Sequence, residues 1–516
     1  MTQIAFYIVS DVHGYIFPTN YQERQQQLPM GLLHAEQLIN QDKVNYPLHV
    51  LIDNGDFLQG SPLGHYLAKE LGSAKQLAYI YNHFKFDAGV IGNHEFNFGM
   101  SYLNQTLEAL NYPVLSANIL KDGEPFTGHG VRYIERGGLI IGIIGLTTQY
   151  IPHWEQAAHI EGLTFESATT ALERWLPEVK AHADIIAVCY HGGFECDLTT
   201  GEPTEDLTGE NEGYAMLKQF HQDIDLLITG HQHREIAETV YDIPVIQPGA
   251  KGEKVGRIIL DVERGKIQNA EVSLLSNETL TPASDTEPEF AQKMAAFDAE
   301  VDAWLDVPIA RLEETMIVDD AFVARTTPHP YINFLNYILM DVSGADIAAS
   351  ALFDLSSGFG NEVTMRDVLN NYPFPNTFNV LELTGQDIKD AIELTAEYFS
   401  VKDGQVTVNP EFIYPKPQHY NYDIYSGISY TIKVSNPVGS RVVQLDYQGN
   451  PIHMKETYKV VLNNYRAVGG GNYPMFSADK IVEDIQTEGA QLIIDYLQAH
   501  PELKIPSVTD FKVEYN

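Results

Sequence analysis

Five short polar blocks in the first half of the chain contain the residue types that bind divalent metal ions. The blocks are Asp11-Val12-His13, Gly55-Asp56, Gly92-Asn93-His94-Glu95, His191-Gly192-Gly193 and Gly230-His231-Gln232-His233. Carboxylate, amide and imidazole groups without a cysteine thiolate suit Mn²⁺, Fe or Zn²⁺. The five blocks together therefore predict a centre that binds two divalent metal ions.

Each block follows an apolar, β-rich run that predicts a buried strand. The runs cover residues 4–9, 49–52, 87–91, 184–190 and 224–229. Ligands of open α/β folds bind where strands end and loops begin, so we expect the five blocks to meet at one rim. A single histidine is more often a surface residue than a ligand, and His34 and His65, outside the blocks, are predicted to be solvated. The metal prediction therefore depends on the five blocks occurring together.

Two cations about 3.5 to 4 Å apart need a carboxylate that contacts both, and Asp56 is the candidate for this bridge. The ligands predicted for one ion are Asp11, His13, Asp56 and His233. The ligands predicted for the other ion are Asp56, Asn93, His191 and His231. His94, which is next to Asn93, has no metal ion in this assignment.

Length and charge limit the architecture and the partners. A chain of 516 residues exceeds one hydrophobic core and predicts two domains. The 70 Asp and Glu against 32 Lys and Arg give a formal net charge of −38, which argues against a nucleic-acid polymer or an anionic membrane surface as a partner. Two bound divalent cations would invert the local field, so a small anionic substrate is still allowed. The acidic loop 202–212 is predicted to be solvated.

No apolar run approaches the roughly 20 residues needed to cross a bilayer. The first strand leaves no room before Asp11 for a signal peptide. We therefore expect a cytoplasmic protein, or an exported one if a leader has been removed. The oligomeric state is left open.

Helical and strand patterns alternate through the first half, which is typical of α/β layering. Helices are predicted at 31–41, 64–83, 100–110 and 166–181, and strands at 139–146, 245–247 and 255–262 would complete a second sheet. The polar stretch 276–289, with Pro282 and Pro288, marks a boundary before an amphipathic helix at 290–304. We predict a catalytic domain at 1–278, a linker helix region at 279–307 and a second domain at 308–516.

The densest motif of the second domain is the segment from Asn463 to Pro474, in which three consecutive glycines precede Tyr473. Glycine lets the backbone approach a ligand closely, and Tyr473 is predicted to present an aromatic face. Around this motif we predict helices at 330–342 and 386–399 and strands at 378–383, 429–434 and 457–463.

With these motifs the chain resembles the calcineurin-like metallophosphoesterases, and within them the two-domain nucleotidase branch. The resemblance covers most of the chain and implies an α/β fold, with a four-layer αββα sandwich followed by a C-terminal α+β substrate-binding domain. It implies that His94 is the catalytic histidine. It also implies metal ligands at the positions assigned above, which are Asp11, His13, Asp56, Asn93, His191, His231 and His233.

In that branch a glycine-rich segment ends in an aromatic residue that stacks on the base. The resemblance implies that Phe374 and Tyr473 sandwich a nucleobase, a contact that tolerates different bases. Arg466 and Asn464 are candidate substrate contacts in the same segment. The alternative is that the two aromatic residues are ordinary core residues. Chemistry in one domain and base recognition in the other predict that the linker acts as a hinge.

Two differences from the 5′-nucleotidase pattern favour the branch of the family that opens 2′,3′-cyclic nucleotides and then removes the 3′-phosphate. The 5′-nucleotidases carry a glycine-rich stretch with an Arg that holds the phosphate, whereas the corresponding residues here, 353–360, include no Arg. The 5′-nucleotidases usually have an Asp hydrogen-bonded to the catalytic histidine where this chain has Asn97. Asn97 can orient the His94 imidazole but adds no negative charge to stabilise an imidazolium.

The predicted function is metal-dependent hydrolysis of nucleotide phosphate esters, favoured as a 2′,3′-cyclic-nucleotide 2′-phosphodiesterase and 3′-nucleotidase. A hydroxide bridging the two ions would attack phosphorus in line, and His94 would stabilise the equatorial oxygens or protonate the leaving oxygen. The alternatives are a 5′-nucleotidase or nucleotide-sugar hydrolase, a sulfur-transfer hydrolase on the same scaffold, and a nucleotide-binding sensor without turnover. The choice among Mn, Zn and Fe is open.

Overall fold

The computed structural model describes residues 2–205, 207–277, 288–354, 356–374, 376–414, 417–485, 487–500 and 503–515. The chain divides into two compact units, unit 1 (Met1–Val301) and unit 2 (Asp302–Asn516). The predicted boundary segment 276–289, with Pro282, lies mostly outside the described residues, so the linker limits stay a prediction. Among the described residues, no helix combines the length and the apolar character that crossing a membrane requires.

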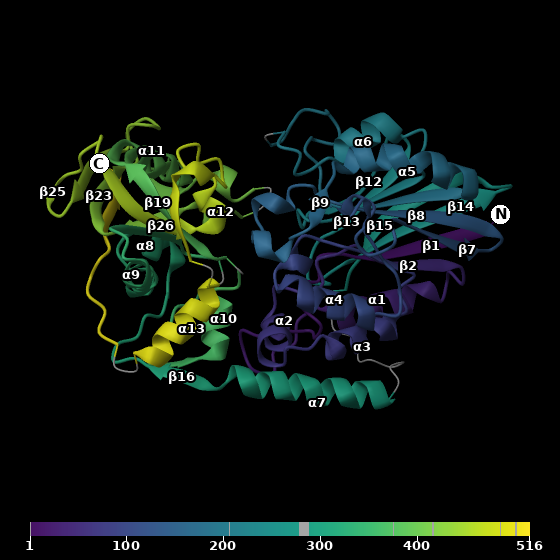
Figure 1. Ribbon diagram of the computed structural model, residues 1–516, viewed down its shortest axis with the longest axis horizontal. Helices are drawn as coiled ribbons and strands as arrows, with labels where there is room; N and C mark the ends of the chain where they lie inside the picture. Colours follow the sequence, from purple (N-terminus) through teal and green to yellow (C-terminus); the bar gives the residue numbers. More distant parts are fainter. Residues whose placement is uncertain are drawn as a thin grey trace. The chain divides into compact units, whose positions relative to one another are not determined.

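Unit 1 is built around two six-stranded mixed sheets (Figure 1). The first sheet has the order β15 (Lys266–Leu275), β14 (Val255–Glu263), β1 (Thr2–Val9), β2 (His49–Asp53), β3 (Ala88–Val90) and β4 (Val114–Leu115). The second has the order β12 (Glu235–Val240), β13 (Ile243–Pro248), β11 (Leu226–Thr229), β10 (Ile185–His191), β8 (Leu139–Thr147) and β7 (Val131–Arg136). A small third sheet contains β6 (Glu124–Pro125), β5 (Ile119–Lys121) and β9 (Leu163–Phe165).

Strand β10 shows how the layers are held together, because successive residues of a strand point to opposite faces. Ile185 and Ala187 pack in the core that β10 shares with β1 and β2 of the first sheet. Ile186 and Val188 face the other way, into a core that contains residues of helices α5 (Ala168–His182) and α6 (Gly213–Phe220). Burial on both faces explains why this run is apolar at nearly every position.

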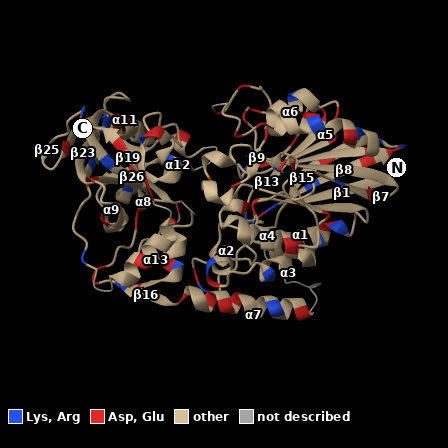
Figure 2. Ribbon diagram, in the orientation of Figure 1, with Lys and Arg blue, Asp and Glu red and all other residues tan. Residues whose placement is uncertain are grey.

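Helices cover the outer faces of both sheets (Figure 1). Helices α1 (Leu32–Lys43), α3 (Lys75–Phe84) and α4 (Gly99–Ala109) lie on the side of the first sheet, and α5 and α6 lie on the second. Figure 2 marks charged residues on α5 and α6, and the same helices carry the buried Leu172, Leu176 and Leu217. The layers therefore follow the order helix, sheet, sheet, helix, and the predicted αββα sandwich is confirmed.

Three details of unit 1 differ from the sequence prediction. Strand β14, expected in the second sheet, pairs antiparallel with β1 in the first. The helix predicted at 64–83 is divided into α2 (Pro62–His65), the π-helical η1 (Tyr66–Glu70) and α3, because Gly72 adopts a left-handed conformation that ends the first segment. His34 and His65 are buried, not solvated, because α1 and α2 turn these positions inward.

Helix α7 (Pro288–Leu305) contains the boundary between the two units, and unit 2 has a five-stranded and a four-stranded sheet. The five-stranded sheet has the order β22 (Asp423–Ser426), β17 (Ile347–Ala351), β26 (Thr457–Asn463), β19 (Phe378–Thr384) and β27 (Ile481–Ile485). The four-stranded sheet has the order β25 (Asn450–Pro451), β24 (Val442–Tyr447), β23 (Ile428–Lys433) and β28 (Asp510–Glu514). Two strand pairs complete the unit, β16 (Pro308–Arg311) with β18 (Glu362–Thr364) and β20 (Phe399–Lys402) with β21 (Gln405–Val408).

Unit 2 contains the helices α8 (Ala321–Thr326), α9 (Pro330–Ser343), α10 (Met365–Asn371), α11 (Gly385–Thr395), α12 (Asn464–Ala467) and α13 (Gly489–Ala499). All of these helices except α13 begin at a residue whose side chain caps the helix. Thr364 with Asp367, and Thr384 with Asp387, form capping boxes at the starts of α10 and α11. The mixture of helices with two sheets agrees with the predicted α+β domain.

Candidate metal centre

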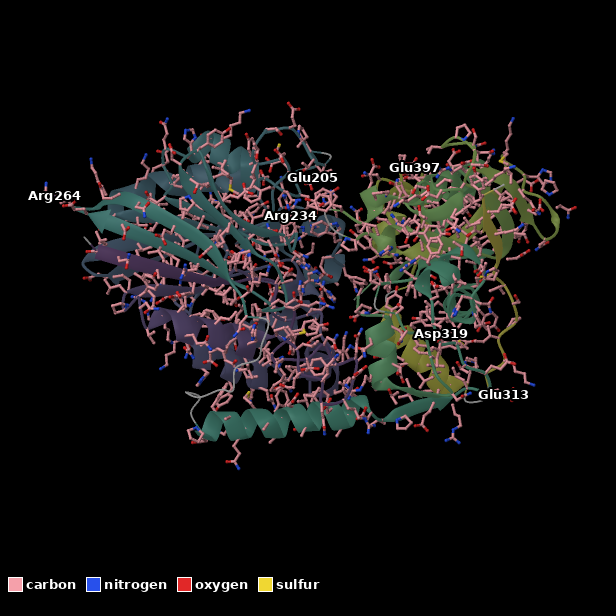
Figure 3. All side chains as sticks on the ribbon, turned by 180° about the vertical axis from the view of Figure 1, so that it is seen from behind. Glu205, Arg234, Arg264, Glu313, Asp319 and Glu397 are labelled. Carbon is pink, nitrogen blue, oxygen red and sulfur yellow. The ribbon has the colours of Figure 1, made fainter. Side chains whose placement is uncertain are left out.

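The predicted metal ligands lie at the carboxyl ends of five strands. Strands β1, β2 and β3 run parallel in the first sheet, and β10 and β11 run parallel in the second. Parallel strands end at the same edge of a sheet, so the loops that follow them meet there. Figure 3 labels Arg234, which follows His233 at this edge, and Arg264, which lies in the turn between β14 and β15 at the other end of the sheet.

The backbone of these loops is strained at the ligand positions. Five of the seven predicted ligands have a φ angle between 53° and 66°, and they are Asp11, His13, Asp56, His231 and His233. This left-handed conformation is uncommon for residues other than glycine and costs on the order of 1 kcal/mol or more at each position. Residues held in such conformations cluster at functional sites. The backbone therefore indicates a functional site independently of the side-chain types.

Hydrogen bonds to backbone carbonyls orient two of the histidines. His13 Nδ1 donates to the Gln59 carbonyl oxygen at 2.9 Å, and His191 Nδ1 donates to the Asn54 carbonyl oxygen at 2.7 Å. In the neutral form each imidazole then has its lone pair on Nε2. A hydrogen bond from the ring nitrogen that does not bind the metal is the usual means by which proteins orient a histidine ligand.

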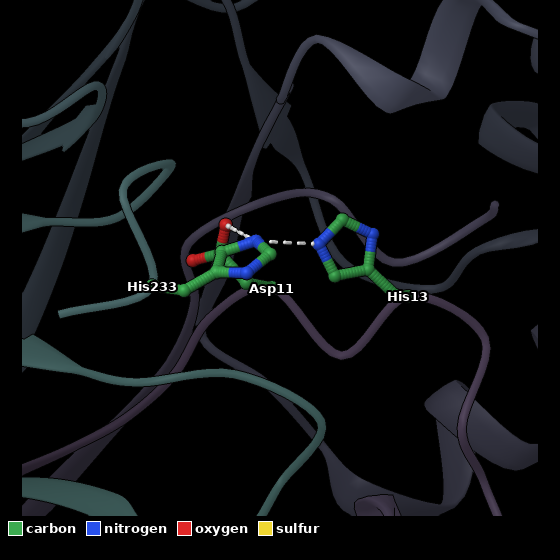
Figure 4. A group of neighbouring side chains, drawn as sticks. All are labelled: Asp11, His13 and His233. Atoms are coloured by element: carbon green, nitrogen blue, oxygen red, sulfur yellow. Dashed lines mark hydrogen bonds and ion pairs between the residues drawn. The ribbon is translucent and has the colours of Figure 1, made fainter. Parts of the chain in front are cut away.

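The free nitrogens converge with carboxylates. His13 Nε2 and His233 Nε2 lie 2.8 Å apart, and Asp11 Oδ1 is 3.5 Å from His233 Nε2 (Figure 4). Asp56 Oδ2 is 3.1 Å from His191 Nε2. The lone pairs of His13 Nε2 and His233 Nε2, only 2.8 Å apart, repel each other unless a cation or a proton lies between them. The donor set therefore fits divalent metal ions.

The candidate ligands form three overlapping groups, in each of which one donor atom per residue lies within 4.8 Å of the others. The groups are Asp11 with His13 and His233, His13 with Asp56 and His94, and Asp56 with His191 and His231. Asp56 and His13 each belong to two groups, and of these two residues Asp56 has the carboxylate with two oxygens that a bridge requires. The structure thus brings these predicted ligands together, and their division between two ions stays a proposal.

His231 connects the remaining predicted ligand to the site. Its Nδ1 lies 2.9 Å from Asn93 Oδ1, and its Nε2 lies 3.0 Å from Glu210 Oε1. The Trp154 ring stacks on the imidazole with 5.4 Å between the ring centres. Glu210 belongs to the acidic loop that we expected to be solvated; residues 203–205, 207 and 208 of this loop are exposed, whereas Glu210 is half-buried against His231. No spacing in the sequence distinguishes Glu210 from its acidic neighbours.

Burial and the charges within the cluster set the protonation states. Burial lowers the pKa of His13 to about 3, which leaves the imidazole neutral, as a metal ligand must be. Burial opposes ionisation of Asp56, but the neighbouring His191 and His94 hold the pKa of this carboxyl well below its usual value. Burial raises the pKa of Asp11 to about 6, against the opposing effect of His191. His13 and Asp56 are therefore in the forms that bind cations.

Glu95 holds the two loops that carry Asp56 and Asn93. Its carboxylate accepts hydrogen bonds from the backbone N–H groups of Asp56 at 2.9 Å, Phe57 at 2.8 Å and Gly92 at 2.5 Å. A Cβ atom at Gly92 would lie 2.2 Å from Asp56 Oδ1, which explains the glycine at this position. Glu95 therefore fixes the loop from which the Asp56 carboxylate projects.

His94, which shares a group with His13 and Asp56, is contacted by Asn97 as the sequence predicts. His94 Nδ1 is 2.6 Å from Asn97 Oδ1, and the His94 backbone N–H donates to Asp56 Oδ1 at 2.8 Å. Asn97 Nδ2 in turn donates to Glu155 Oε2 at 2.7 Å. The sequence does not single out Glu155, because it lies in a loop well beyond the predicted strand 139–146 and belongs to no motif.

The two predicted base-stacking residues of unit 2 have different environments. Phe374 is exposed and lies edge-on to Phe353, with 4.9 Å between the ring centres. Tyr473 is only 2% exposed, its ring stacks on Phe476, and its hydroxyl is 2.7 Å from Thr395 Oγ1. The expectation that Tyr473 presents an aromatic face to a base therefore does not match this structure, because tertiary packing covers the ring.

Arg466 is also enclosed. Its Nε donates to Asp423 Oδ2 at 2.6 Å, and its guanidinium lies 4.0 Å from the Tyr473 ring centre. Arg466 thus supports the glycine-rich segment and does not match the expected substrate contact. Asn464 is the first residue of α12, and the neighbouring Tyr465 is partly exposed.

Two sequence families match the chain. The calcineurin-like phosphoesterase family matches residues 4–235, and the 5′-nucleotidase C-terminal domain matches residues 308–478. A Staphylococcus aureus protein provisionally named a 5′-nucleotidase, solved in complex with alpha-ketoglutarate, is 53% identical. The match covers 99% of this chain and 100% of that one, with a TM-score of 0.91.

Two further relatives are more distant. The trifunctional nucleotide phosphoesterase protein YfkN of Bacillus subtilis is 26% identical over 96% of this chain, and the chain spans 38% of that protein's length. A Haemophilus influenzae protein named 2′,3′-cyclic-nucleotide 2′-phosphodiesterase/3′-nucleotidase is 25% identical, over 96% of this chain and 84% of the relative.

Proposed function

The chain belongs to the calcineurin-like phosphoesterases that carry a 5′-nucleotidase C-terminal domain, and from this premise we propose that it is a 2′,3′-cyclic-nucleotide 2′-phosphodiesterase and 3′-nucleotidase. Members of this family are hydrolases of nucleotide phosphate esters. The finer assignment follows the name of the Haemophilus influenzae relative.

The observation that carries the choice of ester is the amide of Asn97, 2.6 Å from His94 Nδ1. A neutral amide stabilises an imidazolium less than a carboxylate does. A strained cyclic diester needs less proton donation to its leaving oxygen than an unstrained monoester. The segment 353–360 has no arginine of its own, and its Asp354 carboxylate lies 3.8 Å from Arg325 Nη2. The missing arginine also supports the proposal.

Two ligand sets would hold the metal ions, Asp11, His13, Asp56 and His233 for one and Asp56, Asn93, His191 and His231 for the other. Bound divalent cations supply Lewis-acid polarisation of the phosphoryl group and lower the pKa of water. The protein's own contribution is to hold His94 beside this centre. Its Nδ1 donates to Asn97, so Nε2 is the atom that faces a phosphoryl oxygen; His94 donates from Nε2 to that oxygen or to the leaving oxygen as the imidazolium, with a proton on both ring nitrogens.

A second candidate, a 5′-nucleotidase, is supported by the 53% identical Staphylococcus aureus protein of that provisional name. The two candidates differ in the ester they cleave fastest. They are therefore separated by kinetics and not by the presence of activity.

The test uses the full chain, stripped of metal and reconstituted with Mn²⁺, Zn²⁺ or Fe²⁺. Phosphate or nucleotide release is measured with 2′,3′-cyclic AMP, 3′-AMP, 5′-AMP and UDP-glucose. We expect kcat/KM for 2′,3′-cyclic AMP to exceed that for 5′-AMP by at least about tenfold, which is about 1.4 kcal/mol of transition-state stabilisation. A preference for 5′-AMP would replace the proposal with the second candidate. The absence of turnover with every metal would support a sensor.

A further inference from the structure

We propose that Glu155 is a positioning residue that sets the tautomer of His94 through Asn97. The inference rests on the proposed phosphoesterase function, in which His94 Nε2 faces the substrate. Glu155 lies between the short helices η3 (Ile151–His153) and η4 (Ala157–His159), in the segment that follows β8. Its side chain is only 5% exposed, so a role in solubility does not explain it.

Both oxygens of the Glu155 carboxylate are engaged. Oε2 accepts a hydrogen bond from Asn97 Nδ2 at 2.7 Å. Oε1 accepts one from the Gln156 backbone N–H at 2.8 Å and lies 2.9 Å from His159 Nδ1. The carboxylate is therefore fixed in place on the side of Asn97 that faces away from His94.

This placement determines which way the Asn97 amide points. An asparagine amide can turn over, and its hydrogen-bond partners decide its orientation. A carboxylate only accepts hydrogen bonds, so Glu155 requires the Asn97 NH₂ group on its own side and turns Oδ1 toward His94. Oδ1 also only accepts, so His94 Nδ1 must carry the proton. Nε2 is then the nitrogen that is available for chemistry.

Glu155 thus performs a task that an aspartate at position 97 would not need. A carboxylate at 97 presents an acceptor oxygen to His94 in either orientation, whereas an amide does so in only one. Without an acceptor at 155, a turned amide would direct its NH₂ group at His94 Nδ1, and a proton on Nδ1 would then have no acceptor and would face the amide hydrogens. A histidine that cannot keep a proton on Nδ1 cannot form the imidazolium that acts as an acid at Nε2.

The test exchanges the amide and the carboxylate. Glu155→Gln keeps the side-chain shape. The oxygen of the new amide accepts the hydrogen bond from the Gln156 N–H, so the NH₂ group of the new amide faces Asn97. The Asn97 amide then turns over, and its NH₂ group points toward His94. We expect kcat to fall about 100-fold with KM within about twofold. Asn97→Asp/Glu155→Gln restores an acceptor beside His94 Nδ1 at the same net charge. We expect this double variant to regain kcat to within about tenfold of the wild type.

A matched control is Glu161→Gln, on an exposed residue of the same segment, which should leave kcat and KM unchanged. A double variant as slow as Glu155→Gln would overturn the proposal, since a structural role for Glu155 predicts no rescue. So would a Glu155→Gln variant that raises KM or loses bound metal at unchanged kcat.

Two further readouts separate this inference from the proposed function. The rates are also measured with bis(p-nitrophenyl) phosphate, which needs no nucleoside recognition, so the same ranking there without nucleotide turnover would refute only the nucleotidase assignment. In protein labelled with ¹⁵N-histidine, the His94 Nδ1 signal should be that of a protonated nitrogen in the wild type and the double variant, and should shift in Glu155→Gln. Unchanged signals in all three proteins would overturn the inference even without catalysis.

Discussion

Replacing Arg466 distinguishes a side chain that holds the fold of unit 2 from one that holds the substrate. The guanidinium is 1% exposed, Nε donates to the equally buried Asp423 at 2.6 Å, and Nη2 donates to Asn421 Oδ1 at 3.2 Å. Removing one partner of a buried ion pair leaves the other charge unpaired, which costs about 3 to 5 kcal/mol. Arg466→Met is therefore expected to destabilise unit 2 by that amount.

Hydrogen exchange of the β26 amides in the full-length protein measures this free energy. Arg466→Met/Asp423→Leu should cost much less than the two single substitutions together, because it leaves no charge unpaired. The matched control is Arg311→Met, which removes an exposed pair with Glu362 in the same unit and should change stability by less than about 1 kcal/mol.

One result would refute this reasoning. If Arg466→Met kept the exchange protection of the wild type and raised KM for nucleotides about tenfold, Arg466 would be a substrate contact that the native packing merely covers. The sequence prediction that Arg466 contacts the substrate would then be supported, and the buried pair with Asp423 would not contribute to stability.

Three further predictions concern the metal centre and stability. Asp56→Asn should abolish binding of both cations in a Mn²⁺ titration, because both proposed ligand sets share its carboxylate. Glu210→Gln should lower about tenfold the affinity for the cation that His231 is proposed to bind, because Glu210 orients this histidine. Burial lowers the pKa of His65 from 6.5 to about 4, so the stability present above pH 6.5 is lost as pH falls through 4. His65→Leu should remove about 3 kcal/mol of this dependence in urea unfolding at pH 7 and pH 4.

Each of these expectations has an outcome that contradicts it. Asp56→Asn that still binds one ion tightly would show that the carboxylate is not shared. Glu210→Gln with wild-type affinity would mean that the contact with His231 is incidental. The control for the pH series is His129→Leu, at an exposed histidine, and an equal change in acid sensitivity for both variants would exclude burial of His65 as the cause.

The cluster of candidate metal ligands could be predicted from the sequence because its signal is local. Each ligand follows its strand by a few residues, and an apolar run identifies a strand without knowledge of its neighbours. Asp11 after β1 and His191 at the end of β10 are examples. The rim on which they meet then follows from the general behaviour of parallel strands.

The parts that could not be predicted depend on contacts between distant residues. The pairing of β14 with β1 joins segments some 250 residues apart, and nothing in the composition of β14 selects one sheet over the other. Glu155 and Glu210 are acidic residues in loops, like many others in this acidic chain, until the fold places them beside Asn97 and His231. The aromatic ring of Tyr473 fits a binding face or a core equally well, and only packing decides between them.

The division of the ligands between two sheets has a mechanical consequence. Asp11 and Asp56 are carried by one sheet and His191 and His231 by the other, and apolar side chains such as Cys189 fill the space between the sheets. Cations shared by both sides would clamp the halves of the sandwich together. At a free concentration of 1,000 times Kd such a clamp adds about 4 kcal/mol to the resistance against unfolding. The melting temperature of unit 1 would then depend on how fully the two metal sites are occupied. A change in the packing between the two sheets would in turn weaken metal binding.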